Sequence, residues 1–267
     1  MFKRVLSGMV LVSASGAAAG QPLQPVGSWV LDYRPTQCIA SRKYENAAQP
    51  TILAIRQSPN GETYEIRVAR NSQVSEPIKE EEGTVDFGRG PIAAWVLFYQ
   101  TPKRTLDVHQ FRIPATDMAQ ARSANEVTLQ IAGSSDFTFT LDSMPQLLDG
   151  LQTCTANLKR YWNMDGEKDG TFSRLSRGDL RSIFNPGDYP IEAMKRGQEG
   201  KGQYLLLVDE KGKVAGCQVL LATGMPILDA EACAVIETRA KFTPALDKSG
   251  KPVRSTVVTP PIYWKFG

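Results

Sequence analysis

The chain has 267 residues, of which 22% are charged, and its formal net charge is +3. So small a net charge argues against nucleic acid as the main partner, because such binding needs a concentrated basic face. The length suits two small domains.

The N-terminus has the layout of a cleavable secretory signal. Two positive charges at residues 3–4 precede an apolar run over residues 5–12, and Ala17 and Ala19 form an A-x-A pattern. The run is far shorter than the ~20 residues that cross a bilayer. We therefore expect residues 1–19 to be removed as a signal peptide, which leaves a periplasmic protein with no membrane span in the mature chain.

All four cysteines follow that segment, at Cys38, Cys154, Cys217 and Cys233. An even number of cysteines in an exported protein predicts disulfide bonds. Three pairings are possible, and the domain division described below favours Cys38–Cys154 and Cys217–Cys233. No C-x-x-C motif is present, so a redox motif or a zinc cluster is not expected, and no metal or cofactor site is predicted.

Residues 24–162 are mostly strand-like. Two β-rich runs flank a Pro-Asn-Gly turn signal at residues 59–61, which predicts a hairpin. Residues 93–99 are continuously apolar and suit a central strand, and apolar residues alternate over 127–131 and 137–141. We expect six or seven strands in a sandwich or an open barrel.

A helix is expected to complete this β-rich N-terminal domain. Apolar residues spaced by three or four over residues 144–161 share one helix face. Ser143 is a plausible N-cap, and Pro145 fits a first turn. Cys154 lies on the apolar face, so a bond to Cys38 would fix this helix to the first strands.

No catalytic arrangement is recognisable in this domain, and we do not expect an enzyme. His109 is the only histidine of the chain and lacks the companions of a metal site or a nucleophile, so a structural or surface role is favoured. The charge run Glu80–Glu82 follows a proline and is expected to form a solvated loop.

Residues 163–187 are rich in glycine and charge, which predicts a linker with at most one helical turn. Residues 165–170 match several positions of a calcium-binding loop. Ser176, however, stands where such a loop needs a bidentate glutamate. A flexible loop is therefore favoured over a calcium site.

The last 80 residues predict a small α+β unit. A proline marks a helix start near residue 190, and Gly212 is suited to a tight turn between two strands. The order is helix, strand, strand, helix and strand, with the later elements expected at residues 203–208, 213–221, 227–242 and 254–266.

Residues 188–267 resemble the C-terminal domain of TonB, the periplasmic energy transducer of Gram-negative bacteria. The cysteine pair resembles a variant found among alphaproteobacterial members. The resemblance implies two helices packed on a three-stranded antiparallel sheet, and a role in binding a short extended peptide of an outer-membrane receptor. It is carried by Tyr189, Pro190, Ala193, Gly200, Gly212, Val214, Val219, Phe242 and Pro244.

Such a peptide would bind by β-strand addition to an open sheet edge, where backbone N–H and C=O groups lack partners. We expect the last strand to be this edge, with the Tyr-Pro segment alongside it. Pro260 and Pro261 cannot donate hydrogen bonds and should end or bulge the usable strand. The expected partner-binding residues are Tyr189, Pro190, Arg254, Ser255, Thr256, Val257, Val258, Thr259 and Ile262.

Three functional interpretations follow. The first is a periplasmic protein-interaction module that docks a segment of a cell-envelope protein. The second, if the signal is uncleaved, is a membrane-anchored energy transducer for TonB-dependent transport. A 25-residue linker reaches at most ~85 Å, which argues against transmission of force from the inner membrane. The third is a small-ligand or enzyme domain at residues 24–162 carried by the docking domain.

Overall fold

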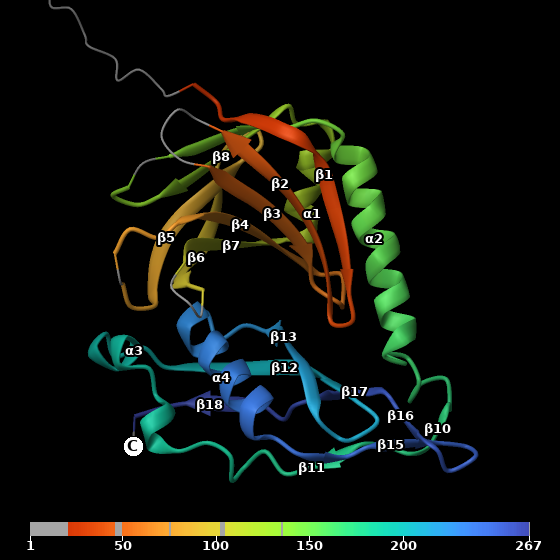
Figure 1. The fold of residues 1–267 in the computed structure, drawn as a ribbon. Coiled ribbons are helices and arrows are strands. Elements are labelled where there is room, and N and C mark those ends of the chain that lie inside the picture. Colours follow the sequence, from red (N-terminus) through yellow and green to blue (C-terminus); the bar gives the residue numbers. More distant parts are fainter. Residues whose placement is uncertain (1–20, 46–49, 75, 102–104, 135, 267) are drawn as a thin grey trace, which may run out of the picture.

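The computed structural model describes residues 21–45, 50–74, 76–101, 105–134 and 136–266. The segment expected to be a signal peptide lies outside the described residues. The described chain forms a large, strongly curved sheet with a long helix beside it, and a smaller α+β unit packed against one end of that sheet (Figure 1). The α+β class expected from the sequence is confirmed.

Nine antiparallel strands form the large sheet, in the order β1-β2-β3-β4-β7-β6-β5-β8-β9. Leu23 N–H donates to the Thr138 carbonyl at 2.7 Å, and Thr140 N–H donates to the Leu23 carbonyl at 3.1 Å. The first and last strands therefore meet, and the sheet is an almost closed barrel. The strands are β1 (Gln24–Arg34), β2 (Gln37–Glu45), β3 (Thr51–Gln57), β4 (Thr63–Asn71), β5 (Lys79–Asp86), β6 (Ile92–Gln100), β7 (Leu106–Pro114), β8 (Glu126–Ile131) and β9 (Phe137–Thr140).

Alternating side chains fill the barrel. In β3, for example, Leu53 and Ile55 are buried while their neighbours are partly exposed, as a strand with one inner face requires. Tyr44 packs edge-on against Phe139, with 4.9 Å between ring centroids. The interior is thus a packed hydrophobic core.

The charge run Glu80–Glu82 does not form the solvated loop expected from the sequence. It lies in β5, where Glu80 is buried and Glu82 is exposed. A solvated loop was expected because three consecutive carboxylates rarely form a buried strand. Glu80 is buried because it faces hydrogen-bond donors of the second unit, which no local pattern reveals.

Helix α2 (Met144–Tyr161) has the predicted bounds and packs across β1, β2 and β3. Its buried face, which includes Leu148 and Leu151, joins the barrel core. Ser143 stands at the N-cap position but has a left-handed backbone, and its hydroxyl makes no capping hydrogen bond. A short helix, α1 (Ala115–Met118), and a 3-10 turn, η1 (Ala119–Ser123), connect β7 to β8.

The C-terminal unit is a small antiparallel sheet centred on β12 (Gly200–Val208). β13 (Val214–Leu221) pairs with one side of β12, while β17 (Ser255–Val258) and β18 (Ile262–Trp264) pair in turn with the other. The single last strand expected from the sequence is therefore interrupted. Helix α4 (Pro226–Arg239) packs on β13 and β12, and α3 (Ile191–Lys195) precedes the sheet.

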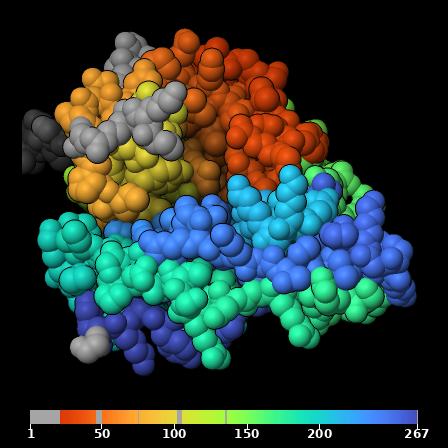
Figure 2. Space-filling model, turned by 60° about the horizontal axis from the view of Figure 1, so that its bottom comes forward, coloured from red at the N-terminus to blue at the C-terminus, as the bar shows by residue number. Residues whose placement is uncertain are grey.

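The segment expected as a linker makes regular contacts with this unit. β10 (Phe172–Arg174) pairs with β15 (Ala245–Asp247), which pairs with β16 (Pro252–Val253), and β11 (Arg177–Gly178) pairs with β14 (Phe242–Thr243). A second 3-10 turn, η2 (Pro186–Asp188), ends the segment. In Figure 2 this green-to-teal segment runs across the surface of the C-terminal unit. Strands of two or three residues are too short to show a hydrophobic period.

Both disulfides have the expected pairing. Cys38 of β2 is bonded to Cys154 of α2, and Cys217 of β13 is bonded to Cys233 of α4. The first bond fixes the long helix to the barrel. The second fixes the main helix of the C-terminal unit to its sheet.

Candidate partner-binding edge

β17 is an edge strand of the C-terminal sheet, and β12 is its single partner strand among the described residues. Thr259 N–H donates to the Tyr204 carbonyl of β12 at 2.9 Å. Because backbone groups alternate in direction along an antiparallel strand, Val258 and Thr256 direct their N–H and C=O groups away from β12. Val258 is 53% exposed. The outer side of β17 therefore offers backbone groups for pairing with a further strand.

A hollow of about 520 Å³ lies against this strand. Its lining includes Phe172 and Leu175 of the preceding segment and residues 255–258 of β17. Leu205 of β12 and Leu220 of β13 line it as well, so it lies over one face of the sheet. At its near end, the hydroxyl groups of Ser176 and Ser255 are 2.7 Å apart. The first residue of β17 is thus engaged within the chain, while the outward backbone groups of Thr256 and Val258 have no partner strand among the described residues.

Two prolines interrupt the edge between β17 and β18. Thr259, just before them, is 1% exposed, and its hydroxyl accepts a hydrogen bond from Tyr204 N–H at 3.1 Å. Pro260 and Pro261 have no N–H group, so no strand can pair with donors at this point. The edge consists of two short pairing segments separated by a bulge, as expected from the two prolines.

Tyr189 lies beside β18 and not beside β17. Its ring is 5.3 Å from that of Trp264 and 4.9 Å from that of Phe266, centroid to centroid. Its hydroxyl donates to the Gln198 carbonyl, which fixes the turn after α3. Pro190 is the N-cap residue of α3. The Tyr-Pro segment therefore supports one end of the edge.

The opposite edge of the sheet, β13, is covered. The Glu237 carboxylate of α4 accepts a hydrogen bond from Cys217 N–H at 2.8 Å. A Cβ atom on Gly216 would lie 3.4 Å from Thr36 of the barrel, so the first unit packs closely against this strand. Only one side of the sheet therefore offers an open edge among the described residues.

Residues 185–266 match a protein family described as the Gram-negative bacterial TonB protein C-terminal. This part of the chain is a TonB C-terminal domain. The family is a non-enzymatic interaction domain. No curated protein matches the chain.

Glu80 of the barrel is hydrogen-bonded to the TonB C-terminal domain. Its carboxylate accepts hydrogen bonds from Ile227 N–H in the first turn of α4 and from Gln198 Nε2, both at 2.7 Å. Negative charge is favourable at a helix N-terminus. Leu97 of β6 is buried in the hydrophobic core of the same domain. The two units therefore share both a polar and an apolar contact.

A second polar link at this junction centres on Arg112 of β7. Its guanidinium is 3.5 Å from Glu65 of the barrel and 3.7 Å from Asp229 of α4. Burial raises the pKa of the Asp229 carboxyl, although hydrogen bonds from Thr223 and Tyr204 oppose that effect. These groups hold the N-terminal half of α4 in place.

Arg254 is engaged at the junction between the units. Its guanidinium forms an ion pair with Glu210 at 2.9 Å and lies 4.0 Å from the centre of the Tyr161 ring at the end of α2. Its carbonyl accepts a hydrogen bond from Asn163 Nδ2 at 2.8 Å. Within the segment expected to bind a partner, Arg254 and Ser255 thus contact this chain, and Val257 pairs with Leu206 of β12, whereas the backbone of Thr256 and Val258 faces outward.

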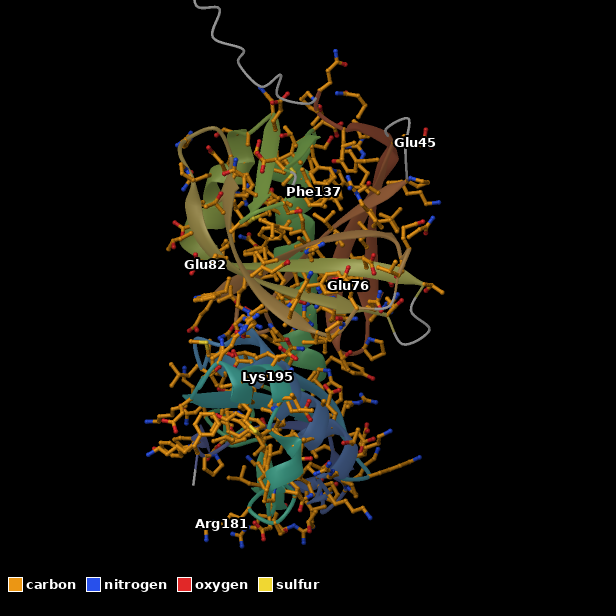
Figure 3. All side chains as sticks on the ribbon, turned by 90° about the vertical axis from the view of Figure 1, so that its left-hand side faces the viewer. Glu45, Glu76, Glu82, Phe137, Arg181 and Lys195 are labelled. Atoms are coloured by element: carbon orange, nitrogen blue, oxygen red, sulfur yellow. A yellow bond between two sulfur atoms is a disulfide. The ribbon has the colours of Figure 1, made fainter. Side chains whose placement is uncertain are left out.

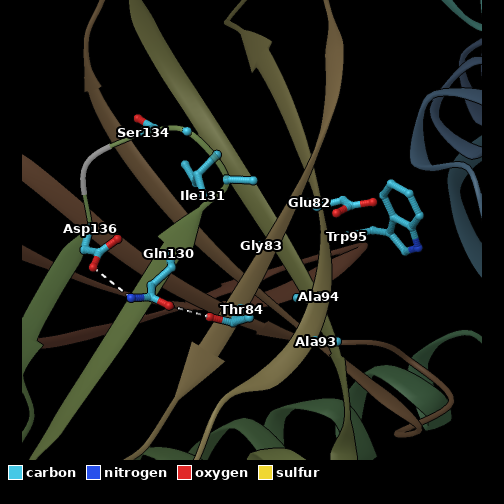
Figure 4. A pocket seen from close by; sticks show the side chains of 12 residues that line it. Glu82, Gly83, Thr84, Ala93, Ala94, Trp95, Gln130, Ile131, Ser134 and Asp136 are labelled. Atoms are coloured by element: carbon cyan, nitrogen blue, oxygen red, sulfur yellow. Dashed lines mark hydrogen bonds between the residues drawn. The ribbon is translucent and has the colours of Figure 1, made fainter.

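The barrel carries a separate hollow on its outer wall, over β5, β6 and β8 (Figure 4). Thr84 Oγ1 donates to Gln130 Oε1 at 3.2 Å, and Gln130 Nε2 donates to Asp136 at 2.8 Å. Trp95, which is 42% exposed, lies at its side next to Glu82. These residues are held by one another and by the sheet, and no nucleophile and base are paired there.

His109 lies inside the barrel. Its Nδ1 is 3.3 Å from Glu81, and its ring is 5.0 Å from that of Phe98. Burial lowers the pKa of His109, and the Glu81 carboxylate opposes that shift. Of the two roles expected from the sequence, structural or surface, the position agrees with the structural one. None of the helices in the described part of the chain is long and apolar enough to cross a membrane.

Proposed function

We propose that the TonB C-terminal domain of this chain binds an extended segment of a cell-envelope protein by β-strand addition along β17. The observation that carries the proposal is the backbone of Thr256 and Val258, which faces away from β12 and has no partner strand among the described residues. Main-chain hydrogen bonds would supply affinity, and alternate side chains would supply selectivity.

The closed β13 edge supports the same assignment. Exposed strand edges attract other chains, and folded proteins cover those that are not used. Here Glu237 and the barrel cover β13, while nothing in the described chain pairs with the outer side of β17. The outer side of β17 is therefore the edge that remains available to a partner strand.

The proposal includes a periplasmic location with the signal removed. Two disulfides fit an oxidising compartment, and the matched family belongs to the Gram-negative envelope. Mass spectrometry of the mature protein should find an N-terminus at Gly20 or Gln21. A chain that retains residues 1–19 in the cell would contradict cleavage and favour a membrane-anchored transducer.

The decisive experiment compares Val258→Pro with Val258→Ala. Proline removes an N–H that faces away from β12 and should leave the β12–β17 ladder intact, whereas alanine keeps the N–H. We expect wild type and Val258→Ala to capture the same envelope proteins from a Gram-negative extract and Val258→Pro to lose them. Retention by a folded Val258→Pro variant would contradict strand addition at this edge.

A further inference from the structure

A cavity of about 460 Å³ lies at the junction between the barrel and the TonB C-terminal domain. We call it the junction cavity. In Figure 3, side chains of both units meet at this junction, between the labelled Glu82 of the barrel and Lys195 of the C-terminal unit. One wall consists mainly of side chains of β3, β4, β6 and β7, and the other of side chains of β13 and α4. The volume suits a small organic molecule, which would contact both units.

Three arginines on the barrel wall of the cavity share one carboxylate. Arg56 donates to Glu65 through two nitrogens, at 2.7 and 3.1 Å, and Arg67 Nη2 donates to it at 2.6 Å. Arg112 Nη2 is 3.5 Å from Glu65, longer than the ~2.9 Å of an ordinary hydrogen bond. This wall therefore carries more positive than negative charge, and Glu65 is already fully engaged by the other two arginines.

Two of these arginines have donors that the chain itself does not satisfy. Arg67 Nε is buried and has no hydrogen-bond acceptor within the described residues. Arg112 Nη1 is 3.7 Å from Asp229 Oδ2, which is beyond hydrogen-bonding reach. Both side chains line the cavity. Planar guanidinium groups complement a carboxylate or a phosphate, because their N–H donors match the spacing of two oxyanion oxygens.

The opposite wall is largely apolar. Val219 of β13 and Ala230 of α4 line it, together with the disulfide between Cys217 and Cys233. An anion that carries an apolar body would bury that body against these side chains. A bare inorganic anion would leave this wall unused.

The carboxylates of the same wall favour a single negative charge on the ligand. Glu237 lines the cavity and accepts the Cys217 N–H, so a dianion would be repelled more strongly than a monoanion. Asp229 is 2% exposed, and its Oδ2 has no hydrogen-bond donor among the described residues. Burial raises the pKa of this carboxyl, which favours the neutral acid, and a neutral acid can donate a hydrogen bond to a ligand oxygen.

We propose that the junction cavity binds a small organic carboxylate with an apolar body. The ligand carboxylate accepts hydrogen bonds from Arg67 Nε and from the Arg112 guanidinium, and the apolar body packs on the β13 and α4 wall. The inference does not depend on strand addition along β17. It adds a small-ligand site whose two walls belong to the barrel and to the TonB C-terminal domain.

The test titrates the full mature protein with benzoate, with its neutral analogue benzamide and with inorganic phosphate, and follows methyl groups by NMR. Leu97 and Val219 line the cavity, whereas Val30, exposed on β1, does not. We expect benzoate to shift the Leu97 and Val219 signals without shifting Val30, and to bind about tenfold more tightly than either other probe, because it alone offers both the charge and the apolar body.

Each departure from this result overturns the proposal. Equal binding of benzoate and benzamide would show that the arginines do not select an anion. Equal binding of benzoate and phosphate would show that the apolar wall contributes nothing. Millimolar benzoate that leaves the Leu97 and Val219 signals unchanged would show that the cavity takes no such ligand.

Variants test the role of the guanidinium groups. Arg67→Gln should weaken benzoate binding about tenfold, to the level of benzamide. Arg89→Gln, at an exposed position between β5 and β6, is the matched control and should keep the wild-type affinity. Arg112→Lys keeps the positive charge but loses the planar fork, so it should also weaken binding, and it decides the test if circular dichroism shows Arg67→Gln to be unfolded. Wild-type affinity for benzoate in the folded variants would overturn the proposal, whatever Val258→Pro does to partner capture.

Discussion

The carboxylate of Glu80 in β5 accepts a hydrogen bond from the backbone N–H of Ile227 in α4, with 2.7 Å between Oε1 and the nitrogen. The two residues belong to different units of the fold. One buried side chain therefore caps the main helix of the TonB C-terminal domain and fixes that helix to the barrel.

Replacing Glu80 should destabilise the protein through this link. Glu80→Ala leaves the Ile227 N–H and the Gln198 amide without partners, which should lower the free energy of unfolding by about 2–3 kcal/mol. Glu82→Ala, at an exposed position of the same strand, should change it by less than ~0.5 kcal/mol. Urea unfolding followed by circular dichroism measures both, and equal effects would show that the Glu80 contact contributes no stability.

Glu65 should make stability depend on pH. Burial alone would raise the pKa of this carboxyl, but Arg56, Arg67 and Arg112 together lower the pKa below its usual range. A lowered folded-state pKa gives stability that is present above the unfolded value of about 4.3 and is lost as pH falls below it.

The free energy of unfolding should therefore fall more steeply between pH 5 and pH 3 in wild type than in Glu65→Gln, estimated from that unfolded pKa of about 4.3. Glu126→Gln, at an exposed position, serves as the control and should keep the wild-type slope. The raised pKa of Asp229 acts in the opposite direction, and Asp229 shares Arg112 with Glu65, so the comparison measures the net effect of Glu65 with this coupling included. Parallel curves of unfolding free energy against pH for wild type and Glu65→Gln would refute the lowered pKa of Glu65.

The two disulfides should differ in their contribution to stability. The Cys38–Cys154 bond closes a sequence separation of 116 residues, and the Cys217–Cys233 bond one of 16. Chain entropy predicts about 5 kcal/mol for the long loop and about 3 kcal/mol for the short one. Double alanine variants of each pair, compared by thermal unfolding, should show the larger loss for the first pair. A larger loss for the second pair would show that loop entropy does not determine how much each disulfide stabilises the protein.

Gly212 should tolerate no side chain. Its φ is +79°, and a Cβ atom at this position would lie 1.8 Å from the carbonyl oxygen of Phe242. The N–H of Phe242 donates a hydrogen bond to the carbonyl oxygen of Gly212 at 2.9 Å. Gly212→Ala should lower the free energy of unfolding by more than ~2 kcal/mol. Gly250 has a φ of +83° but open space around it, so Gly250→Ala measures the backbone strain alone, about 1 kcal/mol. Equal losses would mean that the backbone near Phe242 moves aside.

Long periodic elements could be predicted from the sequence, and contacts between distant segments could not. The apolar spacing over Met144–Tyr161 gave the bounds of α2, because one helix face packs on the barrel along its whole length. The spaced motif from Tyr189 to Pro244 indicated the TonB C-terminal domain. The same resemblance placed the open edge in the last strand, and β17 lies within the residues expected for that strand.

The remaining features depend on tertiary contacts that have no local signature. The charge run at Glu80 is hydrophilic, and its burial requires donors 118 and 147 residues away in the chain. The packing of Phe184 on Trp264 was missed because Phe184 lies in a segment whose composition predicts a linker, and the contact needs the complete fold. Arg254 seemed part of the binding edge, yet its guanidinium contacts Tyr161.

The bond between Cys38 and Cys154 also determines how the molecule would carry tension. A partner that pulls on β17 would load the chain toward residue 162 and then along α2 to Cys154. From there the covalent route to the N-terminal end runs through sulfur to Cys38 and bypasses residues 39–153. With the N-terminal end held, strands β3 to β9 would therefore be spared from stretching, whereas the C-terminal unit between residues 163 and 254 would lie on the loaded path.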